Sequence, residues 1–366
     1  MLDVHREGSR VPMTDPHSAV LSSPGILLAG DRFVRNHLLR DALARSGVDT
    51  TGVVEHELAW PVEPFGDVAE VHEAAGDEGT LCELVRDVEV VVTEMAALTE
   101  RVIAAAGRLK LIVVCRGGPL NVNVDAATAR GIPVCYSPGR NAAATAEYTV
   151  GLMLSALRQI PLAHQDLARG VWRGDFYEYD AAGSELEGKA IGLVGFGAVG
   201  ARVAKVMVAF GSEVLVADPY VTDEAVAEVG AEKVKLAELL PRSSVLSLHA
   251  RLTPETAHII GHGEIAKLPK GAVIVNSARG GLLDYAALCD ALDDGHLRGA
   301  ALDVYDPEPP PPGDRVYTTP RLVLSPHIAG ASRETAERAA RIAAAEVGRY
   351  LRGEPLAHVA NLAALL

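Results

Sequence analysis

Three polar residues suited to ion binding or proton transfer each follow a short apolar run: Arg279, Glu308 and His327. We predict a buried parallel strand in each run, because strands that are covered on both faces are continuously apolar. The runs span residues 272–275, 300–304 and 322–324. Ligands bind outside the carboxyl ends of the strands in an open α/β sheet. The sequence therefore predicts that a cation, a carboxylate and an imidazole meet at one sheet edge, where they could bind an acid and move a proton.

A glycine-rich turn, GLVGFGAVG at residues 192–200, precedes these residues. An apolar segment leads into the turn and a helical pattern follows it. Gly195 would permit a tight turn, Gly197 the close approach of a pyrophosphate, and Gly200 the close packing of helix on strand. The phosphates would lie at the positive end of the helix, so the turn predicts a bound dinucleotide.

An acidic residue, Asp218, ends the strand predicted at residues 213–217. It follows the glycines at about the spacing of the carboxylate that binds the ribose hydroxyls in dinucleotide-binding folds. Its negative charge would also repel the 2′-phosphate of NADP. The sequence therefore favours NAD as the cofactor.

Four more motifs accompany the glycine turn: LHARLTPET at residues 248–256, VNSARGG at 275–281, ALDVY at 301–305 followed by Glu308-Pro309, and SPHIAG at 325–330. Together they resemble the D-isomer-specific 2-hydroxyacid dehydrogenases, the family that includes phosphoglycerate, glycerate and D-lactate dehydrogenases. The resemblance implies an α/β fold with two doubly wound parallel-sheet domains, in which a Rossmann NAD-binding domain is inserted into a flavodoxin-like substrate domain. It also implies an NAD-dependent oxidoreductase that interconverts a small D-2-hydroxy acid and its 2-keto acid.

Reduction of a 2-keto acid needs a cation for the carboxylate and a proton donor for the ketone oxygen. Arg279 offers a planar, two-pronged donor, and His327 can donate a proton near neutral pH. Glu308 would orient the imidazole and favour its charged form. Taken singly, such an arginine is more often a salt-bridge partner and such a histidine a structural residue, but the set beside a dinucleotide turn favours catalysis. The same residues are compatible with an NAD(H)-sensing binding protein of the corepressor type and with a phosphite-type dehydrogenase.

The family resemblance extends the predicted cofactor site along the same sheet edge. The added residues are Ala198, Val199, Pro219, His249, Ala250, Thr256, Ser277, Ala278, Asp303 and Gly330. Asp303 resembles the family residue that contacts the nicotinamide amide, and its alternative role is a cap for the following turn. No set of residues has the spacing of a metal site.

The predicted domain boundaries follow from alternating strand and helix patterns and from the resemblance. We expect a flexible tail at residues 1–24, a discontinuous substrate-binding domain at 25–141 and 333–366, and the NAD-binding domain at 142–332. The tail lacks the apolar core of a secretory signal. A helix predicted at residues 142–160 would, by the resemblance, help to form a homodimer. The alternative is a helix that is buried wholly within one subunit.

The predicted substrate loop departs from the family pattern Arg-x-Gly-x-Gly-x-Asp-Asn. This chain reads RGGPLNVN at residues 116–123, so Arg116, Gly117 and Gly118 remain and Pro119 supplies no amide hydrogen. The family often has Arg-Ser in an earlier turn, where this chain has Glu94. An acid at that place would disfavour a phosphorylated substrate.

The composition fits a soluble enzyme that acts on a small molecule. The net charge of −14 argues against a nucleic-acid partner, because phosphate binding needs a basic face. No apolar run reaches the length of a membrane span, so we expect no membrane partner. The four cysteines lack metal or redox spacing, and we expect a cytoplasmic protein.

Overall fold

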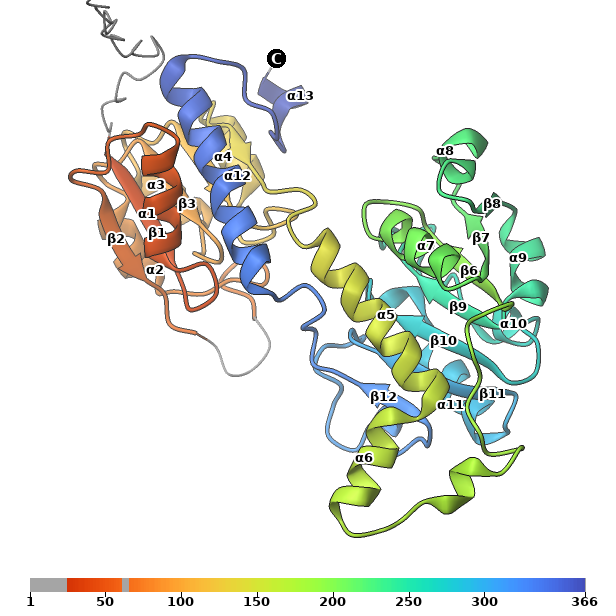
Figure 1. Ribbon diagram of the computed structural model, residues 1–366. Helices are drawn as coiled ribbons and strands as arrows, with labels where there is room; N and C mark the ends of the chain where they lie inside the picture. The colour runs from red at the N-terminus through yellow and green to blue at the C-terminus, as the bar shows by residue number, and fades with distance from the viewer. Residues whose placement is uncertain (1–24, 61–65, 366) are drawn as a thin grey trace, which may run out of the picture. The chain divides into compact units, whose positions relative to one another are not determined.

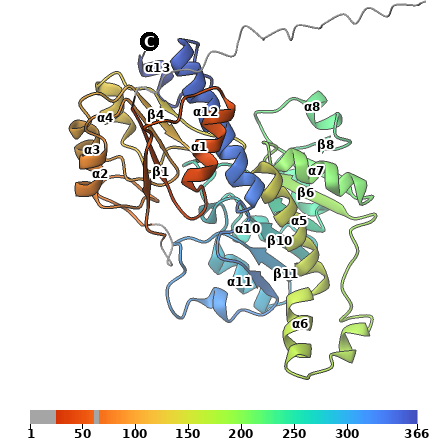
Figure 2. The ribbon, with the colours of Figure 1, turned by 60° about the vertical axis from the view of Figure 1, so that its left-hand side comes forward.

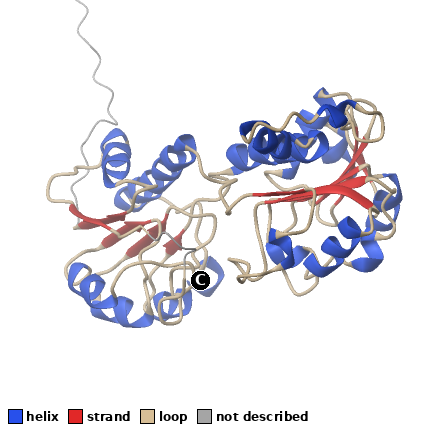
Figure 3. Cartoon of the chain, turned by 90° about the horizontal axis from the view of Figure 1, so that it is seen from below, coloured by secondary structure: helices blue, strands red, loops and turns tan. Residues whose placement is uncertain are grey.

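The computed structural model describes residues 25–60 and 66–365, and they form two compact units. Unit 1 contains the described residues up to Pro138 and from Ala336 onward, and unit 2 is Gly139–Thr335. The tail expected at residues 1–24 lies outside the described residues. In both units a parallel sheet forms a layer between helices, as Figure 3 shows.

The sheet of unit 1 has five parallel strands in the order β2-β1-β3-β4-β5 (Figure 1). Their bounds are β1 Ile26–Gly30, β2 Val54–Glu57, β3 Val90–Thr93, β4 Leu111–Val114 and β5 Val134–Cys135. β1, β3 and β4 are buried along their whole length, which explains their continuous apolar sequence. The strand order is that of flavodoxin-like folds.

Helices cover both faces of this sheet. They are α1 Asn36–Arg45, α2 Glu78–Leu84, α3 Glu100–Ala105, α4 Val124–Ala129, α12 Arg333–Arg352 and α13 Leu362–Leu365. On one face α12 lies beside α1, as Figures 1 and 2 show, and its alanines pack on β1, β3 and β4. On the other face α2, α3 and α4 pack through residues such as Leu81, Ile103 and Ala127. The last segment of the chain thus completes the core of the first sheet.

The C-terminal segment also extends the edge strand β5. The backbone amide of Tyr136 donates to the carbonyl of His358 (3.0 Å), and the amide of Ala360 donates to the carbonyl of Val134 (2.8 Å). The buried Asn361 side chain accepts from the Val134 amide (3.0 Å) and donates to the Ile132 carbonyl (3.0 Å) and the Thr128 hydroxyl (2.9 Å). These bonds satisfy polar groups that β5 would otherwise leave unpaired.

The sheet of unit 2 has seven parallel strands in the order β12-β11-β10-β9-β6-β7-β8. Their bounds are β6 Ala190–Val194, β7 Glu213–Ala217, β8 Glu232–Lys233, β9 Val245–Leu248, β10 Ala272–Asn276, β11 Leu297–Leu302 and β12 Leu322–Leu324. The order reverses between β6 and β9, as in the Rossmann fold, and ligands bind at such a reversal. The predicted fold class is therefore confirmed for both units.

Helices also cover both faces of the second sheet (Figure 1). The helices of unit 2 are α5 Ala142–Arg158, α6 Ile160–Ala168, α7 Gly200–Ala209, α8 Asp223–Ala227, α9 Leu236–Arg242, α10 His262–Ile265 and α11 Tyr285–Asp293. α5 and α7 pack on one face through Met153 and Val203, and α9 to α11 pack on the other. Short 3-10 turns lie at Gly174–Tyr177, Gly280–Leu282 and Arg315–Tyr317.

Two predicted elements have different bounds in the structure. The helix predicted at residues 142–160 ends at Arg158, because Gln159 has a left-handed backbone (φ 53°) and a separate helix, with Pro161 in its first turn, begins at Ile160. The strand predicted at residues 300–304 is β11, which begins at Leu297 and ends at Leu302. Arg298 and Gly299 interrupt its apolar pattern, so its beginning was missed in the sequence.

We predict that Asn361→Ala lowers the free energy of unfolding of unit 1 by about 3 kcal/mol, because it leaves buried backbone groups without partners. Urea titration of the variant and of Leu362→Ala, a control at the half-exposed next residue, measures the difference. Equal stability of the two variants would contradict the role of the Asn361 side chain.

Candidate active site

His327 and Glu308 form a close pair beyond the carboxyl ends of β12 and β11. The His327 Nδ1 lies 2.6 Å from the Glu308 Oε1, and the two side chains are 41% and 28% exposed. The second carboxylate oxygen accepts from the Tyr305 amide (3.3 Å). The pair uses Nδ1, and the Nε2 atom of His327 has no partner among the described residues. This ring nitrogen is therefore available to a ligand.

Arg279 follows β10, the strand beside β11, and its side chain is exposed. Its guanidinium donates to the Ala278 carbonyl (2.6 Å) and forms no ion pair with any described residue. The buried Asn276 shapes this turn, because its side chain donates to the Arg279 carbonyl (2.9 Å) and accepts from the Ala278 amide (3.1 Å). Asn276 was not predicted as a site residue, although an amide that ends a buried apolar strand could have indicated this role.

The turn that carries Arg279 packs directly against the loop that carries Glu308. A methyl group on Gly280 would overlap the Tyr305 carbonyl, and one on Gly281 would lie 3.1 Å from the Asp306 carboxylate. The two glycines of the VNSARGG motif thus allow the loops to approach. The cation and the carboxylate–imidazole pair therefore follow adjacent strands of one sheet, as the sequence predicted.

Asp303, the first residue after β11, connects to the loop that carries His327. It is fully buried, and its carboxylate accepts from the Ser325 hydroxyl (2.6 Å), the Ile328 amide (3.0 Å) and the Ala329 amide (2.8 Å). It therefore caps the loop after β12 and not the turn that follows Asp303 itself. These three bonds use the carboxylate within the protein, which supports a capping role.

Tyr305 adds a second connection between the same two loops. Burial raises the pKa of its hydroxyl to about 12, so the group stays protonated. It donates to the Ser325 carbonyl (2.9 Å). The nearby Tyr285 hydroxyl donates to the Val304 carbonyl (2.6 Å). Both tyrosines thus fix backbone at the carboxyl edge of the sheet, a role that the sequence did not indicate.

The glycine turn between β6 and α7 fits a dinucleotide. Gly195 has a left-handed backbone (φ 99°), and a side chain there would lie 2.6 Å from the Ala250 amide. A methyl group on Gly200 would overlap the Gly195 carbonyl, whereas the space beside Gly197 is open. The structure describes no acceptor for the backbone amides of residues 197–199 at the start of α7. Open space and available amides at a helix N-terminus suit a pyrophosphate.

Asp218 lies just beyond β7 and bridges two loops. Its carboxylate accepts from the Phe196 amide in the glycine turn (2.7 Å) and from the Tyr220 amide (2.8 Å). Each carboxylate oxygen has a further lone pair for a ligand hydroxyl. Pro219, between these residues, is exposed. The position fits the ribose-binding acid that was predicted.

The other predicted cofactor residues also lie beyond strand ends of unit 2. His249 and Ala250 follow β9, Ser277 and Ala278 follow β10, and Gly330 follows β12; Ala198 and Val199 precede α7. The Ser277 hydroxyl lies 2.6 Å from the Thr149 hydroxyl of α5. The Thr256 hydroxyl is used within its own turn, where it donates to the Arg251 carbonyl (2.7 Å) and accepts from the Thr253 amide (2.7 Å).

The predicted substrate residues lie in unit 1, at the carboxyl ends of β3 and β4. Glu94 directly follows β3 and is buried, with 5% of its surface exposed. Arg116 follows β4 and forms an ion pair with Glu73, whose carbonyl it also contacts (2.9 Å). Gly117, Gly118 and Pro119 continue this loop. The positive charge of Arg116 is therefore neutralised within unit 1.

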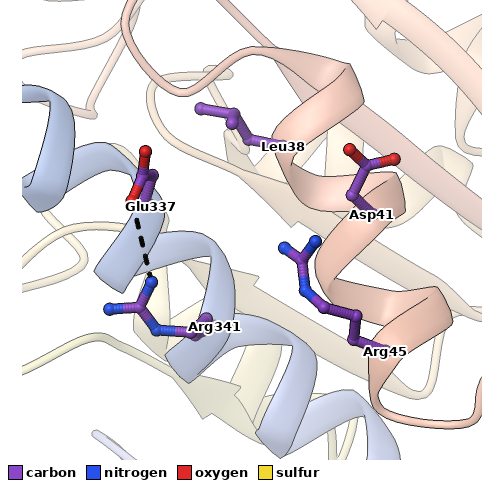
Figure 4. Close-up of a pocket in the computed structure, with 5 residues that line it drawn as sticks. All are labelled: Leu38, Asp41, Arg45, Glu337 and Arg341. Atoms are coloured by element: carbon purple, nitrogen blue, oxygen red, sulfur yellow. Dashed lines mark ion pairs between the residues drawn. The ribbon is translucent and has the colours of Figure 1, made fainter.

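Two hollows on the surface contain none of the predicted catalytic residues. One, of about 350 Å³, lies in unit 1 between α1 and α12, where Leu38 and Arg45 point toward α12 (Figure 4). Its charges are mixed, and Glu337 pairs with Arg341 (3.9 Å). The other, of about 620 Å³, is a groove in unit 2 along α5 and β12. Mixed charge and the lack of an acid–base pair argue against an active site in the first hollow.

Metal binding and membrane insertion receive no support from the described residues. They contain no group of three His, Cys, Asp or Glu side chains placed to hold a metal ion. None of the helices described is both long and apolar enough to cross a membrane.

Comparison with known proteins places the chain in a family. Residues 150–329 match the model for the NAD binding domain of D-isomer specific 2-hydroxyacid dehydrogenases. A glyoxylate reductase from Korarchaeum cryptofilum is 34% identical over 283 residues, which cover 77% of this chain and 85% of that protein. The chain belongs to the D-isomer specific 2-hydroxyacid dehydrogenase family. The matched segment lies within unit 2, which is therefore its NAD-binding domain.

Other similar members of the family are named after different substrates. A D-3-phosphoglycerate dehydrogenase from Methanocaldococcus jannaschii is 41% identical over 311 residues, which cover 84% of this chain and 58% of that protein. The crystal structure of a glyoxylate reductase from Paecilomyes thermophila is similar with a TM-score of 0.72 and 30% identity, over 92% of this chain and 98% of that chain. The chain spans just over half the length of these D-3-phosphoglycerate dehydrogenases, including those from Archaeoglobus fulgidus and Mycobacterium bovis.

His249 gives a pH-dependent contribution to the stability of unit 2. Burial lowers its pKa from 6.5 to about 4, and the ring lies 3.0 Å from the Ser247 hydroxyl. As pH falls below 6.5, His249 binds a proton in the unfolded chain, whereas in the native protein it binds one only near pH 4. Stability is therefore lost on acidification through this window.

We predict that His249→Gln reduces the loss of unfolding free energy between pH 7.5 and pH 5 by up to about 2 kcal/mol. His249 as a whole residue is half-buried, so this value is an upper limit. Urea titrations at both pH values measure the change, and His164→Gln on the exposed face of α6 is the control. An unchanged pH dependence in His249→Gln would contradict the assignment.

Proposed function

We propose that this protein is an NAD-dependent oxidoreductase that interconverts a small D-2-hydroxy acid and its 2-keto acid. The observation that carries the proposal is the 2.6 Å contact between His327 Nδ1 and Glu308 Oε1, at the same sheet edge as the Arg279 guanidinium, which no described carboxylate pairs. An acid–base pair and an available cation at the carboxyl edge of an NAD-binding sheet suit reduction of a keto acid. Family membership and the similar reductases support the same activity.

Each of the three residues has one task in this proposal. Arg279 binds the substrate carboxylate through two parallel hydrogen bonds. His327 gives a proton from Nε2 to the ketone oxygen, because Nδ1 faces Glu308. The Glu308 carboxylate orients the ring and stabilises the imidazolium. When bound, NADH supplies the hydride, so that ketone, NADH and one proton give the alcohol and NAD⁺.

The residues of the glycine turn and of the strand ends hold the cofactor in this proposal. The backbone amides of residues 197–199 bind the pyrophosphate, and Asp218 accepts from the ribose hydroxyls. Ser277, Ala278 and Gly330 line the same edge. These assignments rest on the open space beside Gly197 and on the position of Asp218 beyond β7.

We further propose a cytoplasmic homodimer that forms through unit 2. Several large apolar side chains of the α6 region are exposed in the single chain: Ile160, Leu167, Val171, Trp172, Tyr177 and Tyr179. Trp172 is 83% exposed, so it is not packed against the described part of this chain. The groove along α5 adds a concave apolar surface.

All four cysteines are free, which fits a reducing compartment.

The first functional prediction concerns the catalytic residues. His327→Asn should lower kcat by about 100-fold or more, because the general acid is lost, and should leave the Kd for NADH nearly unchanged. Arg279→Lys should mainly raise KM for the keto acid, because an ammonium lacks the planar fork. Steady-state kinetics with a panel of 2-keto acids measures both effects.

Asp306→Asn is a matched control in the same loop, because Asp306 is exposed and does not contact His327. Wild-type kcat in His327→Asn would refute the catalytic role. If the unmodified protein binds NADH but reduces no 2-keto acid, an NAD(H)-sensing protein becomes the better description. Oxidation of phosphite would instead identify the phosphite-type activity.

The cofactor prediction rests on the charge of Asp218. The Kd should favour NADH over NADPH by at least about tenfold, which corresponds to roughly 1.4 kcal/mol. Asp218→Ala should reduce this preference, chiefly by weakening NADH. Titration of nicotinamide fluorescence measures the Kd for NADH and for NADPH in the unmodified protein and in Asp218→Ala. Equal affinities in the unmodified protein would rule out this role of Asp218.

The substrate prediction is that a non-phosphorylated 2-keto acid is preferred over phosphohydroxypyruvate. Glu94 is buried at the edge of the first sheet. Arg116, the cation of the predicted substrate loop, is already paired with Glu73, so its charge is not available to a substrate phosphate. A substrate phosphate close to the Glu94 carboxylate in a partly dry site would weaken binding by about 1–4 kcal/mol, because the two charges repel. The ratio of kcat/KM for hydroxypyruvate and glyoxylate to that for phosphohydroxypyruvate measures the preference.

The exposed Arg251 of unit 2 is the alternative source of a phosphate-binding cation. Arg251→Gln should leave the preferred substrate unchanged if the prediction is right. A higher kcat/KM for phosphohydroxypyruvate that falls selectively in Arg251→Gln would instead identify a phosphate site.

A further inference from the structure

The loop that carries His327 has an unusual backbone and little packing of its own. His327 has a left-handed conformation (φ 53°), which is unfavourable for a non-glycine residue and persists only when the surroundings impose it. Pro326, His327 and Ile328 are all exposed, so no buried side chain at these three positions fixes the loop. The constraint therefore comes from the buried residues on either side, Ser325 and Ala329, and from the hydrogen bonds of this loop.

Those hydrogen bonds converge on one carboxylate. Asp303 accepts from the backbone amides of the two residues after His327, at 3.0 and 2.8 Å, and from the Ser325 hydroxyl two residues before it, at 2.6 Å. Its own amide donates to the Asn276 carbonyl (3.0 Å) in the adjacent strand β10. Asp303 is fully buried, and its carboxylate forms hydrogen bonds with the loop on both sides of His327.

We propose that Asp303 is a positioning residue, whose buried carboxylate imposes the left-handed conformation of His327 and thereby aims its Nδ1 at Glu308. The inference rests on the proposed function for its kinetic consequence, but its structural part is independent of it. It differs from the role that the family resemblance implied, which was contact with the nicotinamide amide. Hydrogen bonds to an ionised carboxylate are stronger than neutral ones, so three of them can hold an exposed loop.

The test uses the full chain with two variants at this contact. Asp303→Asn keeps the shape but replaces one of the two accepting oxygens by an NH₂ group, which cannot accept from the backbone amide that faces it. Ser325→Ala removes one of the three donors. The control is Asp284→Ala, which removes a carboxylate of the same unit that caps α11 through the Ala287 amide (3.0 Å). The readouts are kcat, KM for the best 2-keto acid, the Kd for NADH, and crystal structures of the loop.

For Asp303→Asn we expect kcat to fall by at least about 10-fold, since small displacements of a catalytic group have such effects, while KM and the Kd for NADH change less than about threefold. Its crystal structure should show residues 325–329 displaced and the contact of His327 with Glu308 broken. Ser325→Ala should lower kcat by a smaller factor, and Asp284→Ala should leave kcat unchanged.

An unchanged loop with wild-type kcat in Asp303→Asn would overturn the proposal. So would an unchanged loop with a Kd for NADH weakened more than about tenfold, because Asp303 would then act on the cofactor. If Asp303→Asn does not fold, Ser325→Ala decides: wild-type kcat and an undisplaced loop overturn the proposal. If the unmodified protein reduces no 2-keto acid, the proposed function fails, and the crystal structures still decide whether Asp303 holds the loop.

Discussion

The parallel direction of the strands is the constraint on which the site depends. All strands of a parallel sheet end at the same edge, and there the chain leaves the ladder with backbone amides that no neighbouring strand can pair. In this protein, buried polar side chains at the strand ends accept those amides: Asn276 at the end of β10, Asp303 after β11 and Thr93 at the end of β3. The loops that carry the exposed residues Arg279 and His327 are thus held by buried side chains.

Much of this arrangement could be predicted from the sequence, because it depends on local patterns. The apolar runs marked the strands, and the residue after each run marked the edge, so the residue pattern alone was enough to group Arg279, Glu308 and His327. The glycine turn was predictable for the same reason, since strand, turn and helix follow one another directly in the chain. The polar edge strand β2 was missed because its sequence, VEHE, lacks the apolar run.

The supporting contacts could not be predicted, since they join residues that only the folded sheet brings together. Asp303 accepts amides that lie 25 and 26 residues further along the chain, and Glu73 pairs with Arg116 from 43 residues away. An acid near a strand end can cap its own turn, bind a cofactor or reach a distant loop, and the sequence does not distinguish these roles. Substrate choice is equally non-local, which is why relatives with similar motifs bear different substrate names.

The chain order of the two units has a consequence during synthesis on the ribosome. Unit 2 is one continuous stretch, but unit 1 needs both the first strands and α12, whose alanines cover β1, β3 and β4. The apolar face of the first sheet and the outer edge of β5 therefore stay uncovered while residues 139–335 are made. At roughly 5–20 residues per second this takes on the order of 10–40 s. A nascent chain in this state exposes apolar surface until α12 and the segment that pairs with β5 have been made.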